Sequence, residues 1–119
     1  MAKNILVVDD EPDVREFLSD YLGDNGFYVR TAEDGTQALK LIETDIPDLI
    51  LLDLMMPEET GTGLYRKLHD KKAYREIPVI VISGAAGRDV AVSKSVPVFD
   101  KPIDKEALLA KIQETIGGR

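Results

Sequence analysis

Three short runs of this sequence consist entirely of aliphatic residues, and they constrain the fold more than any other feature. The runs are Ile5–Val8, Leu49–Leu52 and Val79–Ile82. A strand with one solvated face alternates apolar and polar side chains, whereas these runs do not alternate. We therefore expect three strands that are buried on both faces, as in a parallel sheet covered by helices on each side.

Two further segments have the composition of strands but contain residues that suit the edge of a sheet. Phe27–Ala32 includes Arg30 and Thr31, and Val96–Phe99 includes Pro97. Proline has no amide hydrogen to donate to a neighbouring strand, so it is tolerated at the edge of a sheet. We expect both segments to form edge strands, the second and the last along the chain.

Helical patterns separate these strands. The apolar residues between positions 14 and 22 form one helical stripe, with Pro12 near its start and Gly26 beyond its end. A second helix is expected after Asp34, a third after Gly63, and a last one with Asp104 as its N-cap. Strands and helices therefore alternate along most of the chain.

This alternation predicts an open α/β sheet with right-handed crossovers. Edge strands in the second and last positions fit the flavodoxin-like, doubly wound order 2-1-3-4-5. Between Ser83 and Val96 the pattern fits either a short helix or a loop. We expect one domain over residues 1–119, built on a five-stranded parallel sheet.

The three buried strands and the last strand are each followed by polar residues. These residues are Asp9 and Asp10 after the first strand, Asp53 after the third, Ser83 after the fourth, and Lys101 near the end of the last. In such sheets, ligands bind beyond the carboxyl ends of the strands where the strand order reverses, here between strands one and three. We expect Asp9, Asp10 and Asp53 to meet there.

Three neighbouring carboxylates repel one another, at about 4 kcal/mol per pair for ~4 Å and an effective dielectric constant of about 20. Protonation or a cation must relieve this repulsion, and hard oxygen ligands suit Mg²⁺. An ion held by one or two carboxylates keeps positions open for phosphate oxygens. Together with the Lys101 ammonium and the Ser83 hydroxyl, the set is typical of phosphoryl transfer to an aspartate.

Simpler explanations exist for single members of this set. Asp9 or Asp10 alone could cap the first helix, and Glu11 and Asp13 fit first-turn acids favoured by the helix dipole. The agreement of four strand ends at one edge of the sheet favours a shared site. Asp53 in addition follows four aliphatic residues, where a charge needs a specific reason.

Four segments together resemble the receiver domains of two-component response regulators. The segments are Ile5–Glu11, Asp48–Pro57 with Gly61, Val81–Gly84, and Lys101-Pro102. The likeness extends over nearly the whole chain, and the joint motif is far more specific than any one segment. It implies a phosphoacceptor signalling switch, not an enzyme, although such a domain assists its own phosphorylation and dephosphorylation.

The resemblance also implies a phosphodonor and a metal site. Asp53 would accept a phosphoryl group from the phosphohistidine of a sensor histidine kinase or a phosphotransfer protein. Mg²⁺ would be bound directly by Asp10, by Asp53 and by the backbone carbonyl of Met55, and through water by Asp9.

Two further residues would respond to phosphorylation. Lys101 would pair with Asp53 and then with a phosphoryl oxygen, and the Lys101-Pro102 peptide bond would be cis. Ser83 would bond the phosphoryl group and pull the following loop inward. A downstream effector protein would then recognise the phosphorylated surface.

Two features depart from the family pattern. The stretch from Ser83 to Lys101 is shorter than is usual by about one helical turn, ~4 residues, so the fourth helix is expected to be short or absent. Val98 stands where the family usually has an aromatic residue, and Phe99 follows it. Because neighbouring strand residues point to opposite faces, Phe99 is expected on the other side of the sheet.

Composition narrows the possible partners and compartments. The chain has no cysteine and a single histidine, His69, which excludes thiol redox chemistry and multi-histidine metal sites. A net charge of -7 argues against direct binding to nucleic acid or to an anionic membrane surface. Since no apolar run resembles a signal peptide or a membrane span, we expect a cytoplasmic protein.

Three alternatives use similar residues. A receiver-like interaction module could signal without phosphorylation, although the complete polar set argues against it. A phosphatase of the haloacid dehalogenase type would carry a second aspartate two residues after the nucleophile, where Met55 stands. A flavin-binding protein would need a phosphate-binding loop after the first strand, where Asp9, Asp10 and Glu11 would repel phosphate.

Overall fold

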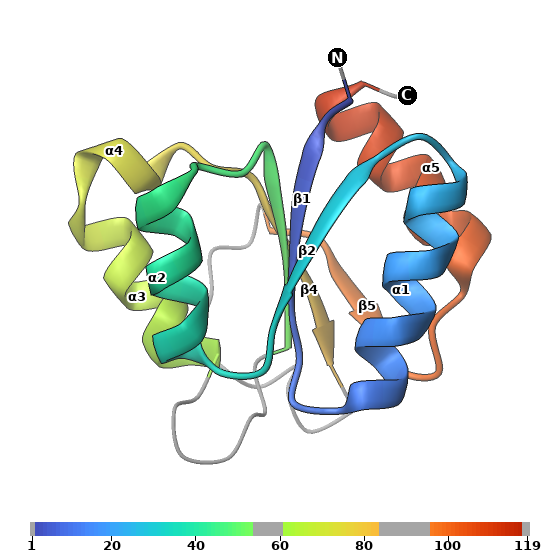
Figure 1. Ribbon diagram of the computed structural model, residues 1–119, viewed down its shortest axis with the longest axis horizontal. Helices are drawn as coiled ribbons and strands as arrows, with labels where there is room; N and C mark the ends of the chain where they lie inside the picture. Colours follow the sequence, from blue (N-terminus) through green and yellow to red (C-terminus); the bar gives the residue numbers. More distant parts are fainter. Residues whose placement is uncertain (1, 54–60, 84–95, 118–119) are drawn as a thin grey trace.

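The computed structural model of the protein describes residues 2–53, 61–83 and 96–117. The elements in chain order are β1 (Asn4–Val8), α1 (Pro12–Asp24), β2 (Tyr28–Ala32), α2 (Gly35–Thr44), β3 (Leu49–Leu52), α3 (Gly61–Asp70), α4 (Lys72–Arg75), β4 (Val79–Ser83), β5 (Val98–Asp100) and α5 (Lys105–Ile116). All strand pairs are parallel, and the order is β2-β1-β3-β4-β5. This arrangement confirms the predicted fold (Figure 1).

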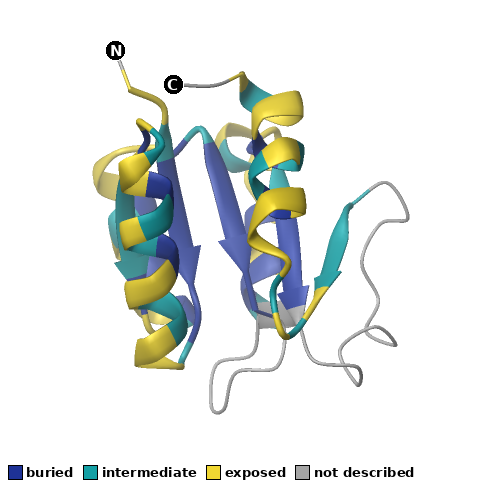
Figure 2. Ribbon diagram, turned by 90° about the vertical axis from the view of Figure 1, so that its right-hand side faces the viewer, coloured by how far each residue is buried: buried dark blue, intermediate teal, exposed yellow. Residues whose placement is uncertain are grey.

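Helices cover both faces of the sheet. In Figure 1, α2, α3 and α4 lie on one side of the strands, and α1 and α5 lie on the other. Leu6 and Val8 belong to the hydrophobic cluster on the first side, whereas Ile5 and Val7 belong to the cluster on the second. Every residue of β3 is buried, and Figure 2 shows the central strands as the most buried part of the fold. The absence of alternation in these runs therefore did indicate two covered faces.

The two edge strands are β2 and β5, as predicted. The last strand begins at Val98, two residues later than expected, because Pro97 has no amide hydrogen for the ladder. The carbonyl of Pro97 still accepts a hydrogen bond from the amide of Val81, at 2.9 Å. Val98 packs with the cluster on the α2 side and Phe99 with the cluster on the α1 side, which confirms that they face opposite ways.

Local signals define the ends of three helices. The Asp34 carboxylate accepts from the amide of Gln37 at 2.8 Å, and the Asp104 carboxylate accepts from the amide of Ala107 at 3.1 Å. These bonds satisfy amides in the first turns of α2 and α5 that have no partner inside the helix. The chain leaves α1 through Gly26, whose φ of 93° lies in the left-handed region that favours glycine.

Other helical predictions need correction. The third helix begins at Gly61 instead of after Gly63, because an apolar stripe marks the packed face of a helix and not its first turn. The four-residue α4, Lys72–Arg75, was not predicted, since one turn is too short to show a period. The fourth helix of the prediction falls on residues 84–95, which lie outside the described residues. None of the described helices is long and apolar enough to cross a membrane.

Candidate functional site

The pairing of β1 with β3 brings two aspartates side by side. Val8 is in register with Leu52, and the amide of Asp53 donates to the carbonyl of Val8 at 3.0 Å. The amide of Asp9 likewise donates to the carbonyl of Ala32 on β2, at 3.1 Å. The sheet ladder thus continues one residue past the strands and fixes Asp9 and Asp53 at its carboxyl edge, which is the lower edge in Figure 1.

A third aspartate completes an acidic cluster at this edge. Asp9, Asp10 and Asp53 each offer a carboxylate oxygen, and these oxygens all lie within 4.8 Å of one another. Asp9 and Asp53 are buried, and Asp10 is half-buried. The predicted meeting of the three acids is therefore confirmed. One divalent cation placed among them would be surrounded by the three carboxylates, held directly or through water.

Lys101 brings a positive charge to the cluster from beyond β5. Its Nζ atom lies 3.2 Å from Asp9 Oδ2 and 3.3 Å from Asp53 Oδ2. It also lies 3.1 Å from Oε1 of Glu11, the exposed N-cap residue of α1. The Lys101-Pro102 peptide bond is cis, as the family resemblance implied.

The acidic side chains of the site outnumber its single lysine. Burial raises the pKa of Asp9, and the nearby charge of Asp53 adds to this, whereas the amide of Glu11 and the ammonium of Lys101 act in the opposite direction. Burial alone would lower the pKa of Lys101, but Asp9, Glu11 and Asp53 outweigh it and hold that pKa above its usual range. A charged lysine cannot balance three ionised aspartates, so the cluster suits a divalent cation.

Two hydrogen bonds shape the loop between β1 and α1. The Asp9 carboxylate accepts from the amide of Glu11 at 2.9 Å, and the Asp9 carbonyl accepts from the Arg15 guanidinium at 2.7 Å. The N-cap of α1 is Glu11, which makes no capping bond with its side chain. The simpler explanation of Asp9 or Asp10 as the N-cap of this helix is therefore wrong, although the Asp9 carboxylate does accept from the amide of the N-cap residue.

Two predicted site residues cannot be placed in full. The backbone of Ser83 ends β4 in register with Asp100, beside the acidic edge, but its side chain lies outside the described atoms. Met55 also falls outside the described residues. Sequence reasoning missed the contact of Glu11 with Lys101, since the two are 90 positions apart and no local pattern links them.

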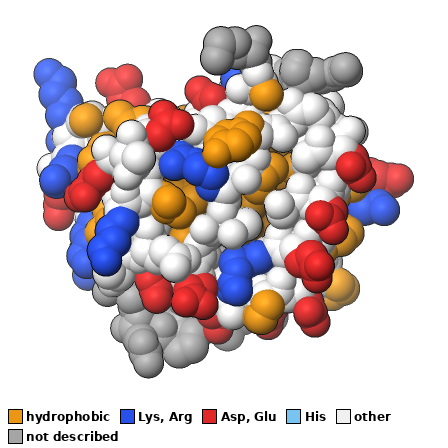
Figure 3. Space-filling model, viewed as in Figure 1, with side chains coloured by type: hydrophobic (Ala, Val, Ile, Leu, Met, Phe, Trp, Pro, Cys, Tyr) orange, Lys and Arg blue, Asp and Glu red, His pale blue; other side chains and the backbone are white. Residues whose placement is uncertain are grey.

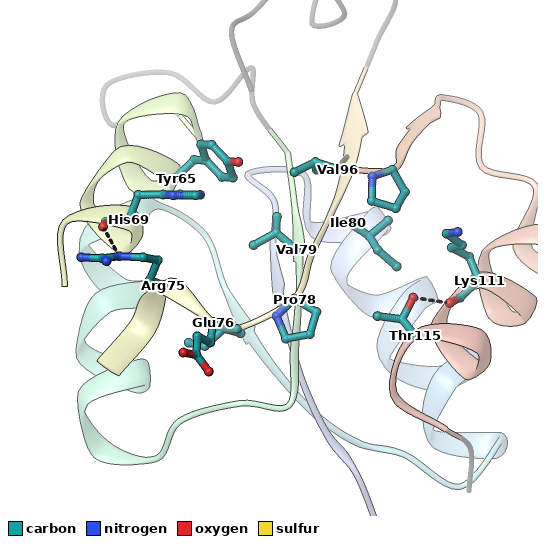
Figure 4. Close-up of a pocket in the computed structure, with 12 residues that line it drawn as sticks. Tyr65, His69, Arg75, Glu76, Pro78, Val79, Ile80, Val96, Lys111 and Thr115 are labelled. Carbon is teal, nitrogen blue, oxygen red and sulfur yellow. Dashed lines mark hydrogen bonds between the residues drawn. The ribbon is translucent and has the colours of Figure 1, made fainter. Parts of the chain in front are cut away.

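A hollow elsewhere in the fold lacks such a convergence of groups. It has a volume of about 410 Å³ and lies between α3, the start of β4 and α5 (Figure 4). The Arg75 guanidinium donates to the His69 carbonyl at 3.0 Å, and the Thr115 hydroxyl donates to the Lys111 carbonyl at 2.7 Å. Both side chains donate to nearby backbone carbonyls and do not point to a shared ligand. The edge of the sheet with Asp53 is therefore the better candidate for the functional site.

Comparison with known proteins identifies the family that the chain resembles. The family model of the response regulator receiver domain matches residues 5–113. The response regulator PleD from Caulobacter vibrioides is 41% identical over 118 residues, which cover 95% of this chain and 26% of PleD. Protein Rrf1 from Nitratidesulfovibrio vulgaris is 28% identical over 116 residues, which cover 98% of this chain and 84% of Rrf1. The chain thus spans about a quarter of one relative and most of the other.

A solved structure supports both the fold and the sequence relationship. The response regulator protein TrrA from Thermotoga maritima, crystallised in complex with Mg²⁺-BeF, superposes with a TM-score of 0.84. The match has 31% sequence identity and covers 95% of this chain and 98% of TrrA.

Proposed function

The chain belongs to the receiver domains of response regulators, and from this premise we propose that Asp53 accepts a phosphoryl group from a phosphohistidine. The donor would be a sensor histidine kinase or a phosphotransfer protein. A carboxylate oxygen of Asp53 attacks phosphorus, the phosphorus–nitrogen bond breaks, and the imidazole leaves with the electron pair. The product is an aspartyl phosphate.

The observation that carries this proposal is the position of the Asp53 carboxylate. It is buried at the carboxyl edge of the sheet, shares a cluster with Asp9 and Asp10, and lies 3.3 Å from the Lys101 ammonium. A nucleophile in this place has positive charge beside it, where negative charge gathers during transfer. Phosphoryl transfer depends chiefly on such positioning and charge stabilisation.

We propose that the cluster holds Mg²⁺ during this reaction. The carboxylate oxygens of Asp10 and Asp53, the backbone carbonyl of Met55 and a water held by Asp9 would together supply the hard oxygen ligands that this ion prefers. When bound, Mg²⁺ would offset negative charge on the cluster and on the phosphoryl oxygens. The Mg²⁺-BeF complex of TrrA supports this choice of ion.

Lys101 and Ser83 would bind the phosphoryl group on Asp53. The Lys101 ammonium, already beside Asp53, would transfer its hydrogen bond to a phosphoryl oxygen. Ser83, which ends β4 at the same edge, would donate its hydroxyl to another phosphoryl oxygen. A shift of these two residues would change the surrounding surface and favour one of two packings.

We propose that residues 1–119 act as one receiver domain. We also propose that a cytoplasmic effector protein recognises its changed surface. Figure 3 shows more acidic than basic side chains over α1. The exposed acids of this helix include Asp13, Glu16, Asp20 and Asp24. An acidic helix suits a protein partner better than it suits nucleic acid or an anionic membrane.

The direct test is phosphorylation by acetyl phosphate in the presence of Mg²⁺, followed by intact mass measurement. We expect one added phosphoryl group on the wild-type protein and on Asp20→Asn, an exposed-site control. Asp53→Asn should remain unmodified because an amide is a poor nucleophile. Equal labelling of Asp53→Asn would refute the site, and an unlabelled wild type would favour a receiver-like module that signals without phosphorylation.

A further inference from the structure

We infer that Glu11 is a positioning residue that restrains the Lys101 ammonium and thereby limits how strongly the site binds a phosphoryl group; this rests on the proposed function. Glu11 has no part in the acidic cluster. It nevertheless makes one of the three carboxylate contacts of Lys101, at 3.1 Å. Its effect therefore acts through the lysine and not through a metal.

Within the described part of the chain, three carboxylates surround the Lys101 ammonium. An ammonium group has three hydrogens to donate, and the three nearby acceptors are Asp9 at 3.2 Å, Asp53 at 3.3 Å and Glu11 at 3.1 Å. The ammonium can donate a hydrogen bond to a phosphoryl oxygen only if one of these contacts weakens. The contact with Glu11 competes for the same donor.

A bound divalent cation separates the role of Glu11 from that of the aspartates. The cation would draw on the charges of Asp9, Asp10 and Asp53, which form the cluster. Glu11, outside the cluster and with 56% of its side chain exposed, would remain the counter-ion of Lys101. Three aspartates, one divalent cation and one lysine sum to zero charge, and Glu11 makes the total -1. An incoming anion would therefore meet an occupied lysine and a net negative site.

The chain provides a matched control for this effect. Asp13 is an exposed acid in the first turn of α1, two residues after Glu11. Asp13, Glu11 and Lys101 all line one hollow on the surface. No ion pair of the described residues joins Asp13 to Lys101. Asp13→Asn thus removes the same unit charge from the same end of the helix and leaves the lysine contacts in place.

The experiment titrates beryllofluoride, a stable mimic of the phosphoryl group, into the full chain at saturating Mg²⁺ and low ionic strength. The dissociation constant is measured by calorimetry for wild type, Glu11→Gln and Asp13→Asn. We expect Glu11→Gln to bind roughly two- to fivefold more tightly, the range of one exposed ion pair. Asp13→Asn should stay near wild type, and added salt should shrink the difference between the variants. Thermal unfolding checks that both variants fold.

The outcomes separate the two proposals. If wild type binds beryllofluoride and Glu11→Gln binds equally or more weakly, the restraint by Glu11 is refuted and the proposed function stands. An equal gain in Asp13→Asn would also refute the restraint, since it would show a general effect of charge. A wild-type protein that binds no beryllofluoride would overturn the proposed function, and the role of Glu11 with it.

Discussion

The ammonium of Lys101 lies 3.3 Å from the carboxylate of Asp53, although the two residues are 48 positions apart in the sequence. Asp53 follows β3 and Lys101 follows β5, which are separated in the sheet by β4. The lysine side chain therefore reaches across the carboxyl end of β4 to meet the aspartate. This contact places a positive charge beside the buried carboxylate of Asp53. We therefore expect the stability of this edge to depend on metal, pH and substitution.

Magnesium should stabilise the folded protein near neutral pH. At a free ion concentration ten to a hundred times its dissociation constant, the expected gain in unfolding free energy is about 1.4–2.7 kcal/mol, because the ion binds only the folded cluster. Asp10→Ala should lose most of this gain, whereas Asp20→Ala, on the exposed side of α1, should keep it. Thermal unfolding with and without a chelator measures the difference, and an equal gain in Asp10→Ala would count against the site.

The metal-free protein should lose stability as pH rises through the titration of Asp9. Burial raises the pKa of Asp9 above its ordinary value of 3.8, so between that value and the raised one the folded state holds more protons than the unfolded state. The unfolding free energy then falls with rising pH across this window. Lys101 does not contribute there, since its raised pKa preserves its stabilising charge up to at least pH 10.5.

Urea unfolding at a series of pH values, in the presence of chelator, checks the contribution of Asp9. Asp9→Asn should have a smaller loss of stability across this window than wild type, because the variant has no proton to release. Saturating Mg²⁺ should also suppress the loss in wild type, since the ion favours the ionised carboxylate. Identical pH profiles for wild type and Asp9→Asn would contradict the prediction.

Lys101→Ala should weaken the metal-free fold and blunt the response to a phosphoryl mimic. Removing the ammonium takes away the positive charge that contacts the buried carboxylates of Asp9 and Asp53, and we expect a loss of about 1–3 kcal/mol in chelator. Mg²⁺ binding should persist because Lys101 is not a ligand, but beryllofluoride should no longer raise the melting temperature. Lys105→Ala is the control, since Lys105 contacts the ring of Tyr21 and not the cluster. Wild-type beryllofluoride binding by Lys101→Ala would disprove this role.

Arg30 should matter for the fold and not for the site. Its guanidinium donates to the carbonyls of Leu41 at 3.0 Å and Asp45 at 2.7 Å, at the carboxyl end of α2. Arg30→Ala should lower the unfolding free energy by about 1–3 kcal/mol, because these carbonyls lose a charged donor. Arg30→Lys should recover only part of the loss, since an ammonium cannot reproduce the planar fork. The stabilisation by Mg²⁺ should be unchanged in both variants, as urea unfolding can show.

Much of the candidate site was predictable because a parallel sheet aligns the carboxyl ends of its strands. Asp9, Asp10 and Asp53 could be placed together once β1 and β3 were expected to be neighbours, and the structure confirms this placement. Glu11 could not be recognised in the same way. Its partner comes from the other end of the chain, and its sequence position fits a first-turn acid equally well. The one-turn helix α4 also left no periodic signal to detect.

The aliphatic runs alone determined the parallel sheet, because strands with two apolar faces must be covered by helices on both sides. The edge position of the last strand followed in the same way from Pro97, which has no amide hydrogen to donate to a neighbouring strand. Only the tertiary structure decided that one ammonium contacts Asp9, Glu11 and Asp53 at once. Such contacts depend on loop paths and side-chain rotamers, which the packing of the complete fold selects and which no local pattern of residues encodes.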